Sequence, residues 1–301
     1  MIKYQSFMKK LSRIALLLAV GFVVGTGLAN VAKAQKGKSS LLWEISGNGL
    51  ESSSYLYGTI HMICVDDFVM NDQIKQAFEK TELTVLEIDM DDSVALKTEG
   101  TKYSVNPGMT NFSAEIDEKD KEVINAFFQE HYKVDLTQLG ILKPFALMSM
   151  VLPKMATCPV KSYEEAFVNY SQEAKKEVVG LETVKFQMTL FDEVPMEKQV
   201  SWLVETIEDM DSQSEEFSKM TKAYTSNDLD GLFSVMTDSP QFRDFEDLML
   251  YDRNRDWISK IEDIIKEQPA FIAVGAGHLA SDQGVVELLK KAGYKVKPIK
   301  F

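Results

Sequence analysis

The 301-residue chain is poor in basic charge and in cysteine, and each shortage excludes a class of protein. Its 33 basic and 46 acidic side chains give a net charge of −13, so we expect no nucleic-acid partner. Two cysteines are too few for a cysteine-rich zinc module or a disulfide-dense mini-protein. Apolar residues are plentiful at 45%, enough for a substantial core without a metal or disulfide.

Long apolar runs are also scarce, and the one long run lies near the N-terminus. A positively charged start is followed by the apolar stretch 14–29 and by the small-residue sequence Ala32-Lys33-Ala34. This is the pattern of a secretory signal peptide cleaved before Gln35. A membrane anchor is the alternative, although the run is short for a span and is interrupted by glycines.

Residues 1–34 are therefore expected to be a signal peptide, and residues 35–301 to form one domain. The mature protein is expected to be periplasmic or secreted, with no stable membrane anchor. In an oxidising compartment the two cysteines, Cys64 and Cys158, favour a disulfide that closes a long loop. A nucleophilic cysteine beside a histidine is the alternative.

Short apolar segments alternate with helical periodicity at both ends of the mature chain. Such segments, bounded by turn residues, predict strands at 41–46, 54–60, 83–89, 177–181, 270–275 and 294–299. Helices are predicted at 70–80 and 284–293, and helical periodicity dominates from about 114 to 226. The order predicts an α/β fold with a largely helical insertion in its middle.

The pattern G-x-x-H lies at the C-terminal end of two of the predicted strands. Gly58 and His61 form the first copy, and Gly275 and His278 form the second, 217 positions later. A glycine at such a place lets the backbone turn sharply and leaves room beside the imidazole. Each histidine has an alternative role as an ordinary polar residue at a strand end, and a dinucleotide-binding turn at Gly275 is a weaker alternative.

Glu87 lies near the end of a third predicted strand. Because open α/β sheets bind ligands at the carboxyl ends of their strands, Glu87, His61 and His278 can open onto one sheet edge. Two imidazoles and a carboxylate suit a divalent ion such as manganese, cobalt or zinc. The third histidine, His131, has no such context and is expected on the surface.

Several motifs together resemble the TraB/GumN family, which includes the TIKI metalloproteases and is related to the ChaN and erythromycin-esterase groups. The resemblance covers about 41–299, and its motifs are LLWEISG at 41–47, SYLYGTIH at 54–61, LEID at 86–89, GLET at 180–183, YDRNRDW at 251–257 and AVGAGHL at 273–279. It implies an α/β fold whose central sheet has two pseudo-symmetric halves.

The resemblance also implies roles for single residues. TIKI-type members are described as divalent-metal-dependent proteases that use the two G-x-x-H histidines and an acidic residue, which here implicates Glu87 as ligand or general base. Arg253 and Asn254 match an R-N element and Glu182 matches an L-E-T element. Substrate or supporting roles are implied for them, with oxyanion stabilisation for Arg253. An ordinary ion pair between Arg253 and Glu182 is the alternative.

Together these features predict an exported divalent-metal-dependent hydrolase that acts on a peptide or protein substrate. A rival from another class is a non-catalytic protein that sequesters a peptide or a porphyrin-like ligand, as the relationship to ChaN allows. A shared fold does not decide between them.

Protein isolated from the native cell envelope should begin at Gln35, because the small residues before it form the cleavage site. Intact-mass spectrometry measures this terminus directly. A chain that still begins at Met1 in the envelope fraction would contradict the predicted export.

Overall fold

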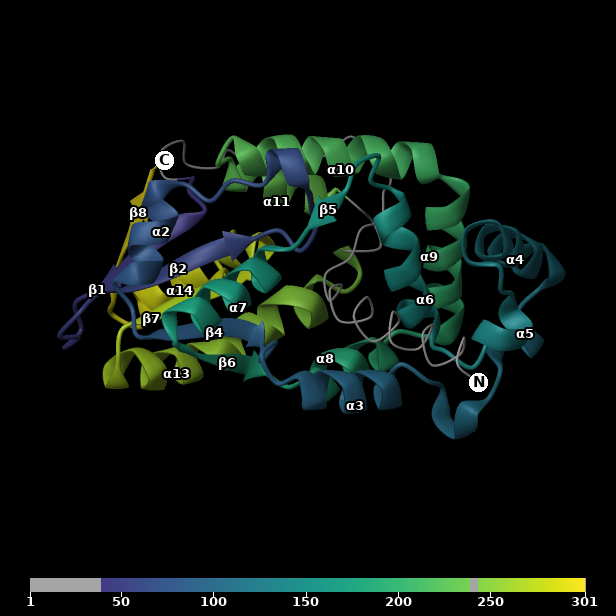
Figure 1. Cartoon of the computed structure of the whole chain (residues 1–301), viewed down its shortest axis with the longest axis horizontal. Coiled ribbons are helices and arrows are strands. Elements are labelled where there is room, and N and C mark those ends of the chain that lie inside the picture. Colours follow the sequence, from purple (N-terminus) through teal and green to yellow (C-terminus); the bar gives the residue numbers. More distant parts are fainter. Residues whose placement is uncertain (1–38, 239–242, 301) are drawn as a thin grey trace. The chain divides into compact units, whose positions relative to one another are not determined.

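The computed structural model describes residues 39–238 and 243–300, and these fall into two compact units (Figure 1). Of the described residues, Asp92–Thr157 and Val184–Glu215 form a helical unit, and the others form a unit built on a sheet. The predicted signal peptide lies outside the described residues. Among the helices that are described, none has the length and apolarity needed to cross a membrane.

A six-stranded sheet organises its unit, in the order β6-β4-β7-β2-β1-β8. The four strands from β6 to β2 are parallel, whereas β1 runs antiparallel to both of its neighbours. The carboxyl ends of the four parallel strands therefore lie along one sheet edge. The strands are β1 (Leu42–Ser46), β2 (Ser54–Thr59), β4 (Leu83–Ile88), β6 (Glu177–Glu182), β7 (Ala270–Gly275) and β8 (Lys295–Ile299).

The turn between β1 and β2 has the chemistry that its backbone requires. Gly47, Asn48 and Gly49 all have positive φ, of 78°, 50° and 85°. Glycine and asparagine tolerate this left-handed region better than other residues. The turn thus sets the antiparallel register in which Leu42 pairs with Tyr57.

Helices α7 and α13 lie on opposite faces of the sheet. Ser171 of α7 hydrogen-bonds Thr84 of β4, whereas Arg253 of α13 contacts Glu87, which strand alternation places on the other face. Phe167 of α7 also packs on Phe271 of β7, with 4.8 Å between ring centroids. The helical elements of this unit are η1 (Val65–Asp67), α2 (Asp72–Glu79), α7 (Tyr163–Ala174), α11 (Leu229–Thr237), the π-helical turn η6 (Asp247–Tyr251), α13 (Asp252–Glu267), η7 (Ala276–Leu279) and α14 (Val285–Lys291).

The helical unit has its own apolar core. Phe128 of α4, Leu147 of α6 and Leu203 of α9 are completely buried within it. Its elements are α3 (Ser93–Tyr103), η2 (Pro107–Met109), η3 (Phe112–Ala114), α4 (Glu118–Tyr132), α5 (Leu136–Leu139), α6 (Pro144–Val151), η4 (Leu152–Lys154), α8 (Val184–Leu190), η5 (Phe191–Glu193) and α9 (Met196–Glu208). Helix α10 (Met210–Thr225) begins in this unit and ends in the other.

These elements confirm the α/β class and the largely helical insertion. Each predicted strand is present, with its ends displaced by at most one residue, and β7 has the predicted bounds. The sequence analysis did not predict β3 (Ile63–Cys64) and β5 (Val160–Lys161), which pair antiparallel. Two residues are too few to show a strand periodicity.

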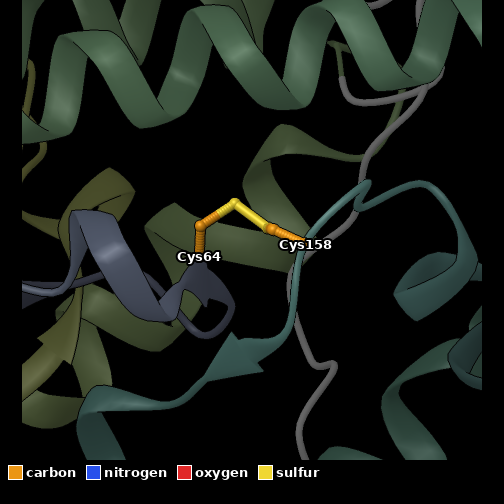
Figure 2. The surroundings of a disulfide bond; sticks show 2 residues. All are labelled: Cys64 and Cys158. Carbon is orange, nitrogen blue, oxygen red and sulfur yellow. A yellow bond between two sulfur atoms is a disulfide. The ribbon is translucent and has the colours of Figure 1, made fainter.

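The predicted disulfide is present and joins the segments that carry this small ladder. Cys64 is bonded to Cys158, and their Cα atoms are 5.6 Å apart (Figure 2). Neither cysteine is free, so a nucleophilic role for either is ruled out in this oxidised form.

Gly180 allows β6 to approach β4 closely. A Cβ atom at this position would lie 2.5 Å from the backbone nitrogen of Asp89, which a rotating side chain cannot relieve. Gly180→Ala should therefore lower the free energy of unfolding by about 1–3 kcal/mol, the usual cost of overpacking. Urea denaturation measures this, with Glu177→Ala at the exposed start of the same strand as the control. Equal stability of the two variants would contradict the close packing.

Candidate functional site

Four neighbouring parallel strands each contribute one acidic or histidine side chain to a cluster at their carboxyl edge. Glu182 ends β6, Glu87 lies near the end of β4, His278 follows β7, and His61 follows β2. The sequence analysis placed three of these groups, Glu87, His61 and His278, at one edge. The fold brings them together as predicted.

Gly275 lies at the point on which the three groups converge. A Cβ atom on Gly275 would lie 3.2 Å from Oε1 of Glu87, 3.4 Å from Nε2 of His61 and 3.6 Å from Cδ2 of His278. The missing side chain therefore leaves a space that all three side chains border. This is the reason for a glycine at this position of the second G-x-x-H pattern.

Gly58 serves the first pattern differently. A Cβ atom there would lie 3.0 Å from Cα and Cβ of Ala276, the residue that follows β7. Its absence allows β2 to pack against the turn η7, which carries His278. The two glycines of the repeated pattern thus have separate tasks: Gly58 permits close packing, and Gly275 leaves room between the polar groups.

Arg253 is the buried cation of the cluster, and its side chain is 1% exposed. Its Nε and Nη2 donate to the two oxygens of Glu182, each at 2.9 Å, and Nη2 also donates to Oε2 of Glu87 at 2.5 Å. Nη1 donates to the carbonyl of Met249 at 3.0 Å and to Nε2 of His278 at 3.1 Å. All five guanidinium N–H groups are therefore engaged.

Asn254, the neighbour of Arg253, fixes the tautomer of His278. Its amide nitrogen donates to the carbonyl of Gln283 at 3.0 Å, so its Oδ1 faces Nδ1 of His278 at 2.6 Å. Nδ1 of His278 must then carry the proton, and Nε2 presents a lone pair, which accepts from Arg253. His278 is therefore a neutral imidazole whose Nε2 is directed into the cluster.

His61 is oriented by Glu164, a residue that the sequence analysis did not select. Nδ1 of His61 lies 2.9 Å from Oε1 of Glu164, in the first turn of α7. The same carboxylate accepts from Thr59 at 2.6 Å and from Ser162 at 2.7 Å. Nε2 of His61, by contrast, is buried and has no hydrogen-bond partner among the described residues.

The two histidines consequently differ in their affinity for protons. Burial lowers the pKa of His278, and the charge of Arg253 lowers it further, well below the ordinary value. Burial also opposes protonation of His61, but the charge and hydrogen bond of Glu164 outweigh it and raise its pKa to about 9. Burial opposes ionisation of Glu87, yet Arg253 holds its pKa far below the ordinary value, so Glu87 is a carboxylate.

Two further expectations concern His131 and the pair of Arg253 and Glu182. His131 is exposed at the end of α4, where its ring packs on Phe127, as expected for a surface residue. The ion pair between Arg253 and Glu182, one of the alternatives for these residues, is present. Glu164 could have been found through the predicted disulfide, which brings position 158 close to position 64 and hence to His61.

Comparison with models of known protein families assigns the chain to one family. The model of the TraB/PrgY/gumN family matches residues 41–298, nearly all of the chain that the structure describes. The chain belongs to the TraB/PrgY/gumN family. No curated protein and no solved structure matches it.

The cluster contains donors of the kinds that bind a divalent ion, imidazole nitrogen and carboxylate oxygen. Oε1 of Glu87 and Nε2 of His278 are 3.8 Å apart, a separation that two ligands ~2.0–2.2 Å from one ion can span. As the side chains stand, no three His, Cys, Asp or Glu residues of the described part form a complete ligand group. To bind the ion, Nε2 of His278 would have to give up the hydrogen bond that it accepts from Arg253.

Removing Arg253 should leave two buried carboxylates without their main counter-charge. We expect Arg253→Met to lower the free energy of unfolding by about 3–5 kcal/mol, measured by urea denaturation of the metal-free protein. Arg255→Met is the matched control, since this half-exposed residue of the same helix pairs with exposed Asp252 and should change stability by less than about 1 kcal/mol. A loss at position 253 no larger than at 255 would show that Arg253 does not hold the cluster together.

Proposed function

We propose that this TraB/PrgY/gumN protein is an exported, divalent-metal-dependent hydrolase that cleaves peptide bonds. The observation that carries the proposal is Nε2 of His61, a buried nitrogen without a partner among the described residues. It borders the same small space as the carboxylate of Glu87 and the ring of His278. A buried acceptor or donor left unpaired is costly unless a ligand satisfies it.

Both histidines are prepared as ligands by the same device. Each has its Nδ1 held by a side-chain oxygen, that of Glu164 for His61 and that of Asn254 for His278. Metal-binding histidines almost always use one ring nitrogen in this way, which fixes the ring and leaves the other nitrogen for the ion. Glu87 would be the third ligand, beside His61 and His278.

A divalent ion bound by His61, His278 and Glu87 would act as a Lewis acid toward a carbonyl and would lower the pKa of its bound water. The residues themselves set the charge and access of the site. Arg253 keeps Glu87 ionised and fixes its Oε2, while Oε1 accepts the N–H of Gly275 at 2.8 Å. His61 is 18% exposed and His278 is fully buried, so a substrate would approach from the side of His61.

Export and peptide specificity have separate support. The Cys64–Cys158 disulfide is typical of an oxidising compartment, in agreement with the predicted signal peptide. Peptide bonds are proposed as the substrate because the motifs resemble those of the TIKI metalloproteases. Arg253 has every N–H engaged, so a role at a developing oxyanion would require it to release one of its present acceptors.

The ligand set predicts which substitutions abolish function. His61→Ala, His278→Ala and Glu87→Ala should each lower the affinity for Mn²⁺, Co²⁺ or Zn²⁺ at least 100-fold and abolish metal-dependent cleavage of a mixed peptide library. Calorimetric titration measures the first effect and mass spectrometry of the peptides the second. Circular dichroism checks that each variant is folded.

His131→Ala is the control, because this exposed histidine lies outside the cluster and should change neither measurement. Cleavage that survives prolonged chelation in the wild-type protein would contradict metal dependence. Peptide or porphyrin binding without turnover, unaffected by chelators, would instead support the sequestering protein.

A further inference from the structure

The disulfide and the His61–Glu164 contact lie at two ends of one small ladder. His61 precedes β3 by two residues, and Glu164 follows β5 by three. Between them Ile63 pairs with Lys161, and Cys64 pairs with Val160. The N–H of Val65 donates to the carbonyl of Pro159 at 2.9 Å. These two residues adjoin Cys64 and Cys158 in sequence, and Figure 2 shows the bond between the cysteines.

This ladder is too small to hold its register unaided. It has two residues in each strand, and both residues of β5 are exposed to solvent. A longer isolated hairpin than this is at best marginally stable in water. The two segments are also 94 positions apart in sequence, so no short turn joins them. The buried Tyr163 also links the two segments, because its hydroxyl hydrogen-bonds the backbone N–H and carbonyl of Val69. The covalent bond adds a constraint at the ladder itself.

The opposite end of the ladder carries Glu164, whose contact with His61 tolerates little displacement. Ser162 precedes α7 and donates to Oε2 of Glu164, while Thr59 at the end of β2 donates to Oε1. His61 completes the group through Nδ1. A shift between the two segments would separate His61 from Glu164, and the imidazole would lose the contact that directs its Nε2 toward Glu87.

We propose that the Cys64–Cys158 disulfide is a positioning element of the site. It holds the His61 segment against the Glu164 segment, and thereby fixes the ring orientation in which His61 acts as a ligand. The proposal rests on the proposed function for the identity of the ligand, but the orientation itself is a property of the metal-free protein.

The test compares the Cys64→Ser/Cys158→Ser variant with the wild-type protein. The affinity for Co²⁺, measured by calorimetry, should fall about 10–100-fold, as expected when the partner of a metal-binding histidine is lost. Glu164→Gln should produce a similar fall. Glu165→Gln is the matched control, because this exposed neighbour on α7 lies outside the group and should leave the affinity unchanged.

Combining the changes separates positioning from general stability. If the disulfide acts through Glu164, the affinity of the triple variant Cys64→Ser/Cys158→Ser/Glu164→Gln for Co²⁺ should be at most about threefold lower than that of either parent variant. Independent effects would instead multiply. Multiplying effects, or an unchanged affinity in the serine variant, would overturn the proposal.

A second measurement does not depend on metal binding. Above pH about 9, where His61 is neutral, imidazole ¹⁵N chemical shifts of the metal-free protein should show a single tautomer of His61 in the wild type, with the proton on Nδ1 facing Glu164. The serine variant should show averaged tautomers, with His278 unchanged as the internal reference. If the wild type binds no metal but shows this difference, the proposed function fails and the positioning role stands. Identical His61 shifts in both proteins would overturn the positioning role.

If the serine variant does not fold, the disulfide can instead be reduced in the folded wild-type protein. A water-soluble phosphine then reduces the folded wild type, converting the two sulfurs to thiols while it is oxidised to the phosphine oxide. After removal of the reagent, the same ¹⁵N measurement applies. Loss of the single His61 form supports the proposal, and its persistence overturns it.

Discussion

The buried guanidinium of Arg253 is the interaction on which the rest of the cluster depends. It neutralises Glu87 and Glu182, which come from the ends of two neighbouring strands, and it donates to His278, which comes from the end of a third. Buried charges of this kind are stable only when the guanidinium and the carboxylates are paired and hydrogen-bonded. The π-helical turn η6 immediately before α13 supplies one of these partners, the carbonyl of Met249.

The buried guanidinium of Arg253 gives the two similar histidine motifs different chemical environments. His278 is enclosed by Arg253, Asn254 and the ring of Trp257, and its pKa is lowered by burial and by the cation. His61 lies at the more open side and faces the carboxylate of Glu164. His278 is therefore held as a neutral imidazole in a fixed orientation. His61 depends on a contact between two segments that meet only through tertiary structure.

The sequence predicted the parts of the site that strand ends determine. Gly58 and Gly275 lie at the ends of strands that their apolar residues mark clearly, and His61 and His278 follow these strands. Parallel strands must end at a common edge. Glu87 was found for the same reason. The environment of these residues was harder to foresee, because it comes from helices whose register on the sheet is set by packing over the whole unit.

Glu164 illustrates this limit. Local sequence marks it as part of a helix start, with Ser162 as the N-cap residue, and nothing nearby indicates a partner 103 positions away. The short strands β3 and β5 likewise leave no recognisable pattern in the sequence. The disulfide was predictable from the number of cysteines and the predicted export signal, and it is the one long-range restraint predicted from the sequence that leads from His61 to Glu164.

X-ray absorption spectroscopy of the cobalt-loaded protein tests the central claim, that His61, His278 and Glu87 hold one ion, most directly. The account predicts a spectrum with two imidazole ligands, reduced to one in His61→Ala and in His278→Ala and unchanged in His131→Ala. Spectra without imidazole scattering, or with the same two imidazoles in all three variants, would contradict it.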